Sequence, residues 1–262
     1  MRANNATAGE DWASEQGRVW PHPQKIAGGP RSSMIPGRMN PPPLLGIVTI
    51  GQTPRPDLVR AFEAHAPGAR VEVLGALDGL SVAEIDALAA RPTDYPLLVK
   101  LADGTSRSIG MAELHPLVEA RAREFGSQGA RVVVVACAGG FPEVHASAPV
   151  ILPGKIVPAV VGAVSVTRRI GVVTPIRAQA GAAEAKWRAD GFDPLVTWAS
   201  PYLHAEIVTA SALMTDPSLE LVVLDCMGHD EEYRREFASL CGKPVLLAQS
   251  IAARVAGELA NG

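Results

Sequence analysis

Two of the three cysteines could act as proton carriers or nucleophiles, because each stands at the end of a predicted strand. Cys137 and Cys226 both follow a run of apolar residues, and each begins a Cys-x-Gly triplet. In an open α/β sheet, ligands bind beyond the carboxyl ends of the strands, next to helix N-termini. The positive end of a helix lowers the pKa of a nearby thiol, and the glycine lets backbone N–H groups approach an anion. We therefore expect two reactive thiols at one ligand site.

The two thiols are compatible with more than one reaction. Thiols on opposite sides of a ligand could remove a proton from one face of a carbon and deliver one to the other face, which is a racemisation or epimerisation without a cofactor. A single thiol such as Cys226 would instead suit cis–trans isomerisation, decarboxylation or hydrolysis. A non-catalytic or regulatory protein that binds a carboxylate is the third alternative. Cys241 stands at the end of a predicted helix without a counterpart and is expected to be structural.

Asp225 and His229 are the other catalytic candidates, because both lie close to Cys226 in the sequence. The carboxylate of Asp225 either accepts hydrogen bonds, for example from Arg254, or serves as an auxiliary base. His229 follows the cysteine by about one helical turn and could activate the thiol or act as an acid. The other histidines have no metal-ligand spacing, so the sequence predicts no catalytic metal.

The matching cysteines belong to a longer internal similarity. The segment 46–49 (Gly-Ile-Val-Thr) resembles 171–174 (Gly-Val-Val-Thr) at an offset of 125 residues, whereas the cysteines are 89 residues apart. The second half is therefore shorter by 36 residues. A repeated strand that leads into a helix, together with a repeated Cys-x-Gly, indicates two related lobes.

The elements that must position these residues alternate between strands and helices from Leu44 onward. The predicted strands are 44–50, 70–75, 96–101, 131–136, 169–174, 195–199, 220–225 and 244–248. The predicted helices lie at about 55–65, 81–90, 111–126, 155–165, 176–190, 203–214, 230–240 and 251–260. Because most strands are apolar on both faces, they are typical of a parallel sheet covered on both sides. The fold class is therefore α/β, with two pseudo-symmetric open parallel-sheet lobes and an active-site cleft between them.

Composition separates the first 43 residues from the rest. This segment holds 7 of the 22 prolines and, among Val, Ile and Leu, only Val19, Ile26 and Ile35. It has too little apolar surface to offset the entropy of ordering and no apolar core of a secretory signal, so residues 1–43 are predicted to be a disordered leader. The remainder divides into a first lobe, 44–150 plus 245–262, and a second lobe, 151–244.

Overall composition excludes several classes of protein. The 262 residues are 47% hydrophobic and 19% charged, which is typical of a globular chain and not of a fibrous one. The net charge is −3 and there is no basic stripe, so nucleic acid is not an expected partner. No stretch reaches the roughly 18 apolar residues of a membrane span. Three scattered cysteines exclude a disulfide framework, and we expect a cytoplasmic protein with a homodimer as the default assembly.

Several motifs together carry a family resemblance. They are 49–57 (Thr-Ile-Gly-Gln-Thr-Pro-Arg-Pro-Asp), 137–142 (Cys-Ala-Gly-Gly-Phe-Pro), 171–175 with Gln179 and Trp187, 225–228 (Asp-Cys-Met-Gly), and 244–247 with 253–254. From about Leu44 to Leu259 the chain resembles the AroM-like family, within the aspartate/glutamate/hydantoin racemase superfamily. The resemblance implies two α/β lobes related by a pseudo-twofold axis, with the last strand and helix returning to the first lobe. It also implies a carboxylate-bearing substrate in the cleft.

The resemblance and the sequence together give the substrate-binding candidates. Racemases commonly have threonine or asparagine directly after each catalytic cysteine to hold the substrate carboxylate, whereas this chain has Ala138 and Met227. Arg55 could clamp a carboxylate with two parallel hydrogen bonds, and Asp57 is expected to be a residue of the first helical turn. The candidates are Thr49, Gly51, Gln52, Arg55, Ala138, Gly139, Thr174, Gln179, Met227 and Gly228. The expected substrate is a small amino acid or carboxylic acid, with no cofactor and no metal.

Overall fold

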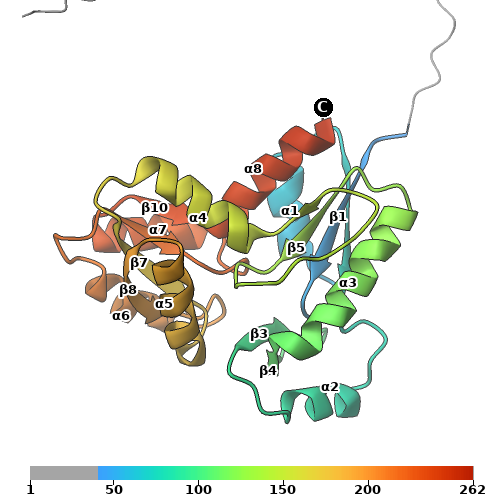
Figure 1. Cartoon of the computed structure of the whole chain (residues 1–262), viewed down its shortest axis with the longest axis horizontal. Coiled ribbons are helices and arrows are strands. Elements are labelled where there is room, and N and C mark those ends of the chain that lie inside the picture. Colours follow the sequence, from blue (N-terminus) through green and yellow to red (C-terminus); the bar gives the residue numbers. More distant parts are fainter. Residues whose placement is uncertain (1–40, 262) are drawn as a thin grey trace, which may run out of the picture. The chain divides into compact units, whose positions relative to one another are not determined.

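A four-stranded parallel sheet forms the framework of the first lobe (Figure 1). The computed structural model describes residues 41–261, so nearly all of the predicted leader lies outside the described residues. The strand order is β2-β1-β5-β6, with β1 at Leu44–Thr49, β2 at Arg70–Gly75, β5 at Val132–Ala136 and β6 at Val150–Ile151. Every residue of β1 and β5 is buried, as the apolar runs predict.

Helices cover both faces of this sheet. Leu45 and Ile47 of β1 pack in one buried cluster with α1 (Pro56–Glu63) and α8 (Ala248–Asn261). Val48, which points to the opposite face, packs in a second cluster with α3 (Met111–Ser127). Successive residues of a strand point to opposite faces, so one short apolar run supplies two separate cores.

The second lobe repeats this arrangement. Its parallel sheet has the order β10-β9-β7-β8. The strands are β7 (Arg169–Thr174), β8 (Asp193–Trp198), β9 (Leu221–Leu224) and β10 (Val245–Leu247). The helices that belong to it are α4 (Pro153–Val164), α5 (Ala180–Ala189), which continues the short helix η1 (Arg177–Gln179), α6 (Ala205–Leu213) and α7 (Glu231–Cys241). Asp230 caps the start of α7 through the N–H of Tyr233, and Gly242 ends it in a left-handed conformation.

The internal similarity is confirmed by the positions of the strands. β1 lies between β2 and β5, and β7 lies between β8 and β9, so the two repeated segments are the equivalent central strands. A Cβ on Gly46 would lie 2.5 Å from the ring of Phe125 in α3. A Cβ on Gly171 would lie 2.4 Å from the sulfur of Met214, at the end of α6. Both glycines therefore allow an equivalent helix to pack closely against the central strand.

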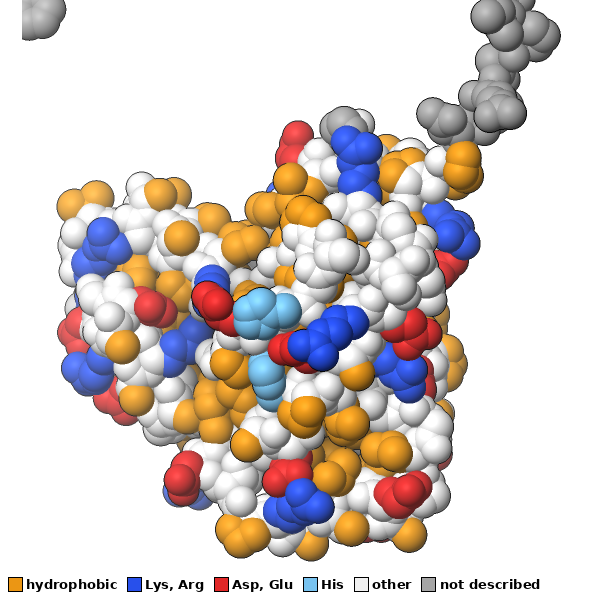
Figure 2. Space-filling view, turned by 45° about the vertical axis from the view of Figure 1, so that its right-hand side comes forward, with side chains coloured by type: hydrophobic (Ala, Val, Ile, Leu, Met, Phe, Trp, Pro, Cys, Tyr) orange, Lys and Arg blue, Asp and Glu red, His pale blue; other side chains and the backbone are white. Residues whose placement is uncertain are grey.

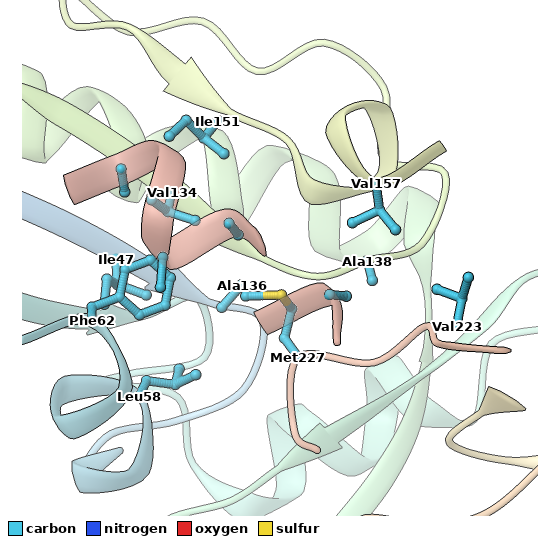
Figure 3. Close-up of a cluster of buried hydrophobic side chains, with 14 of the residues drawn as sticks. Ile47, Leu58, Phe62, Val134, Ala136, Ala138, Ile151, Val157, Val223 and Met227 are labelled. Carbon is cyan, nitrogen blue, oxygen red and sulfur yellow. The ribbon is translucent and has the colours of Figure 1, made fainter. Parts of the chain in front are cut away.

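The ends of the two lobes exchange helices. α8 follows β10 of the second sheet but packs against α1 and β5 of the first lobe. α4 follows β6 of the first sheet, and its Val157 and Val161 share a buried cluster with Val172 of β7. Figure 3 shows Val157 beside Val223 of β9, which belongs to the same cluster. One continuous hydrophobic cluster therefore contains residues of both sheets and both exchanged helices.

The last strand does not return to the first lobe. β10 pairs in parallel with β9, so the expectation that both the last strand and the last helix return is wrong for the strand. Val245 and Leu247 extend the buried face formed by Val222 and Leu224. The second sheet thereby gains its fourth strand, and only the helix that follows crosses to the first lobe.

The extra length of the first half forms an insertion between β2 and α3. It contains α2 (Val82–Ala89), which starts with a capping box between Ser81 and Glu84, and the antiparallel hairpin of β3 (Pro96–Lys100) and β4 (Ser106–Gly110). The predicted strand at 96–101 therefore exists, but it lies outside the parallel sheets. β4 was not predicted, because its sequence Ser-Arg-Ser-Ile-Gly is too polar for the pattern of a buried strand.

The surface of the described residues agrees with the low net charge. Acidic and basic side chains are interleaved on the face that Figure 2 shows. Among residues 41–261, no helix is both long enough and apolar enough to cross a membrane.

Gly257 provides a test of the packing of α8 on the first lobe. A Cβ at this position would lie 2.1 Å from the carbonyl oxygen of His65, so Gly257→Ala must displace the helix. We expect the free energy of unfolding, measured by urea denaturation, to fall by about 1–3 kcal/mol. Gly181→Ala in α5 is the control, because nothing lies within 4 Å of its Cβ and alanine favours the helix. Equal stability of the two variants would contradict the packing described.

Candidate active site

The carboxyl ends of β1, β5, β7 and β9 meet at one cavity. Its volume is about 50 Å³, and a single water needs roughly 10–15 Å³ on the same measure, so the space suits a small molecule. The hairpin strand β3 and the loop after β8 close its other sides. The cavity is lined by most of the predicted site residues: Thr49, Gly51, Arg55, Cys137, Ala138, Gly139, Thr174, Gln179, Asp225, Cys226, Met227 and Gly228.

The two thiols reach the cavity from different lobes. Cys137 follows β5 and Cys226 follows β9, which are equivalent strands. The sulfur of Cys226 accepts a hydrogen bond from the backbone N–H of Gly228 at 3.3 Å. The N–H of Gly139 has the same relation to Cys137. The repeated Cys-x-Gly therefore supplies each sulfur with a backbone donor from the residue two positions later.

The pKa values of the thiols are raised, contrary to the expectation from sequence. Burial raises the pKa of Cys137 to about 12 and that of Cys226 to about 11. The expected effect of a helix N-terminus is missing, because residues 137–149 form a loop and α7 begins only at Glu231. Both sulfurs are therefore protonated at neutral pH.

Arg55 presents a guanidinium to the cavity from the start of α1. Its Nη1 donates to the hydroxyl of Thr49 at 3.0 Å, and its Nε and Nη2 bond the carboxylate of Asp57 at 2.9 and 2.6 Å. Asp57 therefore does more than favour the first helical turn, because it fixes the orientation of the arginine. A guanidinium has five N–H groups, so one on Nη1 and one on Nη2 are left for a ligand.

Asp225 belongs to a buried ion pair. Its Oδ2 accepts a hydrogen bond from the indole of Trp187 at 2.8 Å and lies 3.6 Å from Nζ of Lys186. Arg254, the partner suggested by sequence, has an exposed side chain on α8, so that pairing is wrong. Trp187 is fully buried and anchors the carboxylate beside Cys226.

The imidazole of His229 does not line the cavity, so its predicted catalytic position is corrected. The residue is completely buried, and its ring stacks on that of Tyr233 with centroids 4.4 Å apart. Its Nε2 lies 3.0 Å from the carbonyl oxygen of Ala199 and must donate, since a carbonyl only accepts. His229 precedes α7 and turns into the core, and only its backbone N–H bonds the sulfur of Cys226.

Gln52 is also outside the cavity. Its Nε2 donates to the carbonyl of Leu77 at 3.2 Å, and its Oε1 accepts from the N–H of Ala102 at 3.1 Å. The side chain therefore ties the β1–α1 loop to the insertion. The neighbouring Gly51 does line the cavity, and a Cβ there would lie 2.2 Å from the carbonyl oxygen of Lys100. A larger residue would push the hairpin away from the site.

The other binding candidates combine contact with the cavity and a structural role. Ala138 and Met227 belong to the buried cluster shared by the lobes, and the side chain of Met227 points toward Ala136 in Figure 3. Thr174 donates through its hydroxyl to the carbonyl of Ile176 at 3.1 Å. Gln179 donates to the carbonyl of Pro96 at 2.8 Å and so connects the second lobe to the hairpin.

Three polar residues of the cavity were missed in the sequence. The hydroxyl of Tyr95 accepts from the N–H of Gly140 at 3.1 Å, and Nζ of Lys100 lies 4.7 Å from the ring centroid of Tyr202. Burial raises the pKa of both tyrosines to about 12. Tyr95 and Lys100 belong to the insertion, which has no counterpart in the second half, so a comparison of the halves could not find them.

Comparison with known proteins gives a family and a fold. The model of the family described as AroM protein matches residues 45–260. No curated protein matches the sequence significantly. A crystal structure of arylmalonate decarboxylase is 19% identical over 84% of this chain and 93% of that chain, with a TM-score of 0.54. The allantoin racemase from Klebsiella pneumoniae is 14% identical over 84% of this chain and 88% of that one, with a TM-score of 0.53.

A third solved structure has the same fold. The aspartate racemase of Picrophilus torridus is 10% identical over 84% of this chain and 94% of that one, with a TM-score of 0.52. The AroM resemblance found in the motifs is therefore confirmed, and so is the racemase-like α/β fold with two parallel sheets.

The buried imidazole of His229 predicts a dependence of stability on pH. Burial lowers its pKa from 6.5 to about 4, so between these values the unfolded chain binds the proton and the folded chain does not. The unfolding free energy should therefore fall as pH decreases from 7 to 4, with about 3 kcal/mol of the loss due to this residue. His229→Gln keeps a donor for the carbonyl of Ala199 and removes the titrating group. The unfolding free energy of this variant should therefore fall by about 3 kcal/mol less than that of the wild type between pH 7 and pH 4.

Urea denaturation at pH 7 and at pH 4 measures this difference. His204→Gln is the control, because the side chain of His204 is 72% exposed. Identical pH profiles for the wild type and His229→Gln would show that the imidazole is not buried in its neutral form.

Proposed function

The chain belongs to the AroM family, and from this premise we propose that it is a cofactor-independent enzyme that moves a proton at the carbon next to a carboxylate. The reaction is a racemisation or epimerisation of a small amino acid or carboxylic acid, with Cys137 and Cys226 as opposed acid and base. One observation carries the proposal: two cysteines from equivalent strand ends of the two lobes line a single small cavity. The racemases among the solved structures of the same fold support it.

In this mechanism the substrate carboxylate binds the free N–H groups of Arg55. One sulfur, as thiolate, takes the proton of the α-carbon, and the electron pair of the broken C–H bond moves into the carboxylate. The arginine stabilises this charge. The opposite thiol then gives its proton to the other face of the carbon and becomes the thiolate, so one proton enters and one leaves the substrate. The raised pKa of each thiol makes its thiolate a stronger base but a rarer one.

A specific observation also favours a second candidate, decarboxylation through Cys226. This thiol is protonated at neutral pH, is partly exposed, and interacts electrostatically with Arg55. When a carbon–carbon bond breaks and carbon dioxide leaves, the electron pair stays on the α-carbon. Cys226 would then protonate that carbon and regain its proton from water, without a second thiol. The arylmalonate decarboxylase of the same fold supports this alternative.

Cysteine variants distinguish these reactions. In deuterium oxide, NMR with a panel of small amino acids and carboxylic acids measures both inversion and exchange at the α-carbon. Cys137→Ala and Cys226→Ala should each slow racemisation by about 10²- to 10⁴-fold, because either change removes an acid or base. Each single variant should keep slow exchange on one face only. Cys241→Ala, outside the cavity, is the matched control and should retain full activity.

Two results would reject the two-thiol reaction. Racemisation at the wild-type rate by both variants would remove the cysteines from the mechanism. Release of carbon dioxide that is lost in Cys226→Ala but retained in Cys137→Ala would instead establish the one-thiol decarboxylation. Binding of a carboxylate without exchange or release of carbon dioxide would leave only the binding role.

Arg55→Lys tests the mode of carboxylate binding. Lysine keeps the charge but lacks the planar fork, so at least one charge-assisted hydrogen bond of about 1.5–3 kcal/mol is lost. We expect KM for the carboxylate to rise about tenfold or more. Arg60→Lys, on the exposed side of the same helix, should leave KM unchanged. An unchanged KM in Arg55→Lys would show that the substrate carboxylate binds elsewhere.

A further inference from the structure

A buried ion pair lies between the two cysteine loops. Nζ of Lys186 is 3.6 Å from Oδ2 of Asp225, and the side chains are only 12% and 4% exposed. Among the described residues, neither Nζ nor Oδ1 of Asp225 has a hydrogen-bond partner. The ammonium lies 4.6 Å from the ring centroid of Trp187. The indole N–H of Trp187 donates to Oδ2 of Asp225, the same oxygen that faces the ammonium. Buried charges with unfilled hydrogen-bonding positions are costly, so packing alone does not account for this pair.

The pair lies close to the loops that carry both sulfurs. Asp225 directly precedes Cys226, and a Cβ on Gly140, in the Cys137 loop, would lie 3.9 Å from Cδ of Lys186. Burial is the largest influence on the pKa of Cys137 and raises it. Among nearby charges, Asp225 raises this pKa further and Lys186 lowers it.

The titratable groups that face Cys137 come from three parts of the chain. Tyr95 lies before β3, Cys226 and Asp225 follow β9, and Lys186 belongs to α5. Among these groups Lys186 is the cation. The tyrosine and the other thiol stay uncharged at neutral pH because burial raises the pKa of each. The charge at Cys137 is therefore balanced between one ammonium and one carboxylate.

The arrangement around the other sulfur is related. Arg55, at the start of the helix after β1, lowers the pKa of Cys226 against the dominant effect of burial. Lys186 belongs to α5, the equivalent helix after β7, and acts on Cys137. Each thiol thus faces a cation from the opposite lobe, and each cation is paired with an aspartate.

We propose that Lys186, held by Asp225, is a positioning residue whose ammonium stabilises the thiolate of Cys137. When Cys137 donates its proton to the carbanion, the negative charge that forms on its sulfur lies beside this ammonium. In the reverse direction the thiolate takes the α-proton and the charge passes to the substrate, where Arg55 stabilises it. The role of Lys186 in proton transfer rests on the proposed function, whereas its effect on the ionisation of Cys137 does not.

Alkylation of Cys137 tests the proposal without a substrate. The chain has three cysteines, so Cys226→Ser with Cys241→Ser leaves Cys137 as the only thiol. Below the pKa, the rate with iodoacetamide is proportional to the thiolate fraction. We expect Lys186→Met to slow alkylation about tenfold at a given pH, and Asp225→Asn to speed it about tenfold. Lys186→Arg keeps the positive charge and should keep the wild-type rate. Arg188 is an exposed cation on the same helix, so Arg188→Met should not change the rate.

The opposite signs separate electrostatics from loosening of the structure. Loosening would accelerate alkylation in both variants, so a change in the same direction, or no change in either, overturns the proposal. Thermal melting establishes that each variant folds. If Lys186→Met does not fold, Lys186→Gln takes its place, because it also removes the charge, and an unchanged or faster rate in that variant rejects the proposal. Opposite changes in the alkylation rate, without turnover of any carboxylate, uphold the role of Lys186 and reject the proposed function. Turnover of a carboxylate without these changes upholds the proposed function and rejects the role of Lys186.

Discussion

The close packing of the exchanged helices is the constraint on which the cavity depends. α8 approaches the first lobe so closely that a Cβ on Gly257 would meet the carbonyl of His65. α4 makes an equally close approach at its first turn, where a Cβ on Gly154 would lie 2.1 Å from the carbonyl oxygen of Gly139. The second contact is made with the Cys137 loop itself. The element that joins the cores of the two lobes therefore also fixes the backbone that carries one of the two thiols.

Charge in the cavity follows from the same geometry. Burial keeps both sulfurs protonated, yet Arg55 and Lys186 stand close enough to oppose that effect. Each cation is balanced by its own aspartate, so neither leaves a large excess charge in a buried site. In the reaction proposed, a single negative charge moves between one sulfur, the substrate and the other sulfur. Fixed cations on both sides lower the free energy of the negative charge at each of these places, and the protein does not have to rearrange.

The sequence predicted best those features that repeat. The apolar runs of β1 and β7 and the two Cys-x-Gly triplets identified equivalent strand ends, and these do meet at one cavity. Features without a repeat were missed or misplaced. Tyr95 belongs to an insertion that the second half lacks, and β10 has only three residues, too few for a pattern that distinguishes the sheets. His229 was placed by helical spacing, but α7 starts after it, so its ring turns into the core.

The residues after the cysteines limit how a substrate can be held. The pattern common in racemases would place a hydroxyl or amide at these two positions, but Ala138 and Met227 have none, and both belong to the buried cluster shared by the lobes (Figure 3). Thr174 has its hydroxyl hydrogen on a backbone carbonyl, whereas Thr49 accepts from Arg55 and keeps its own hydroxyl hydrogen for a ligand. Of the polar side chains at the strand ends, Arg55 with its two free N–H groups and Thr49 with its hydroxyl are therefore the donors left for a carboxylate. In the function proposed, recognition of the carboxylate then depends on Arg55 and Thr49 of the first lobe, and the second lobe contributes its thiol and the ion pair behind it.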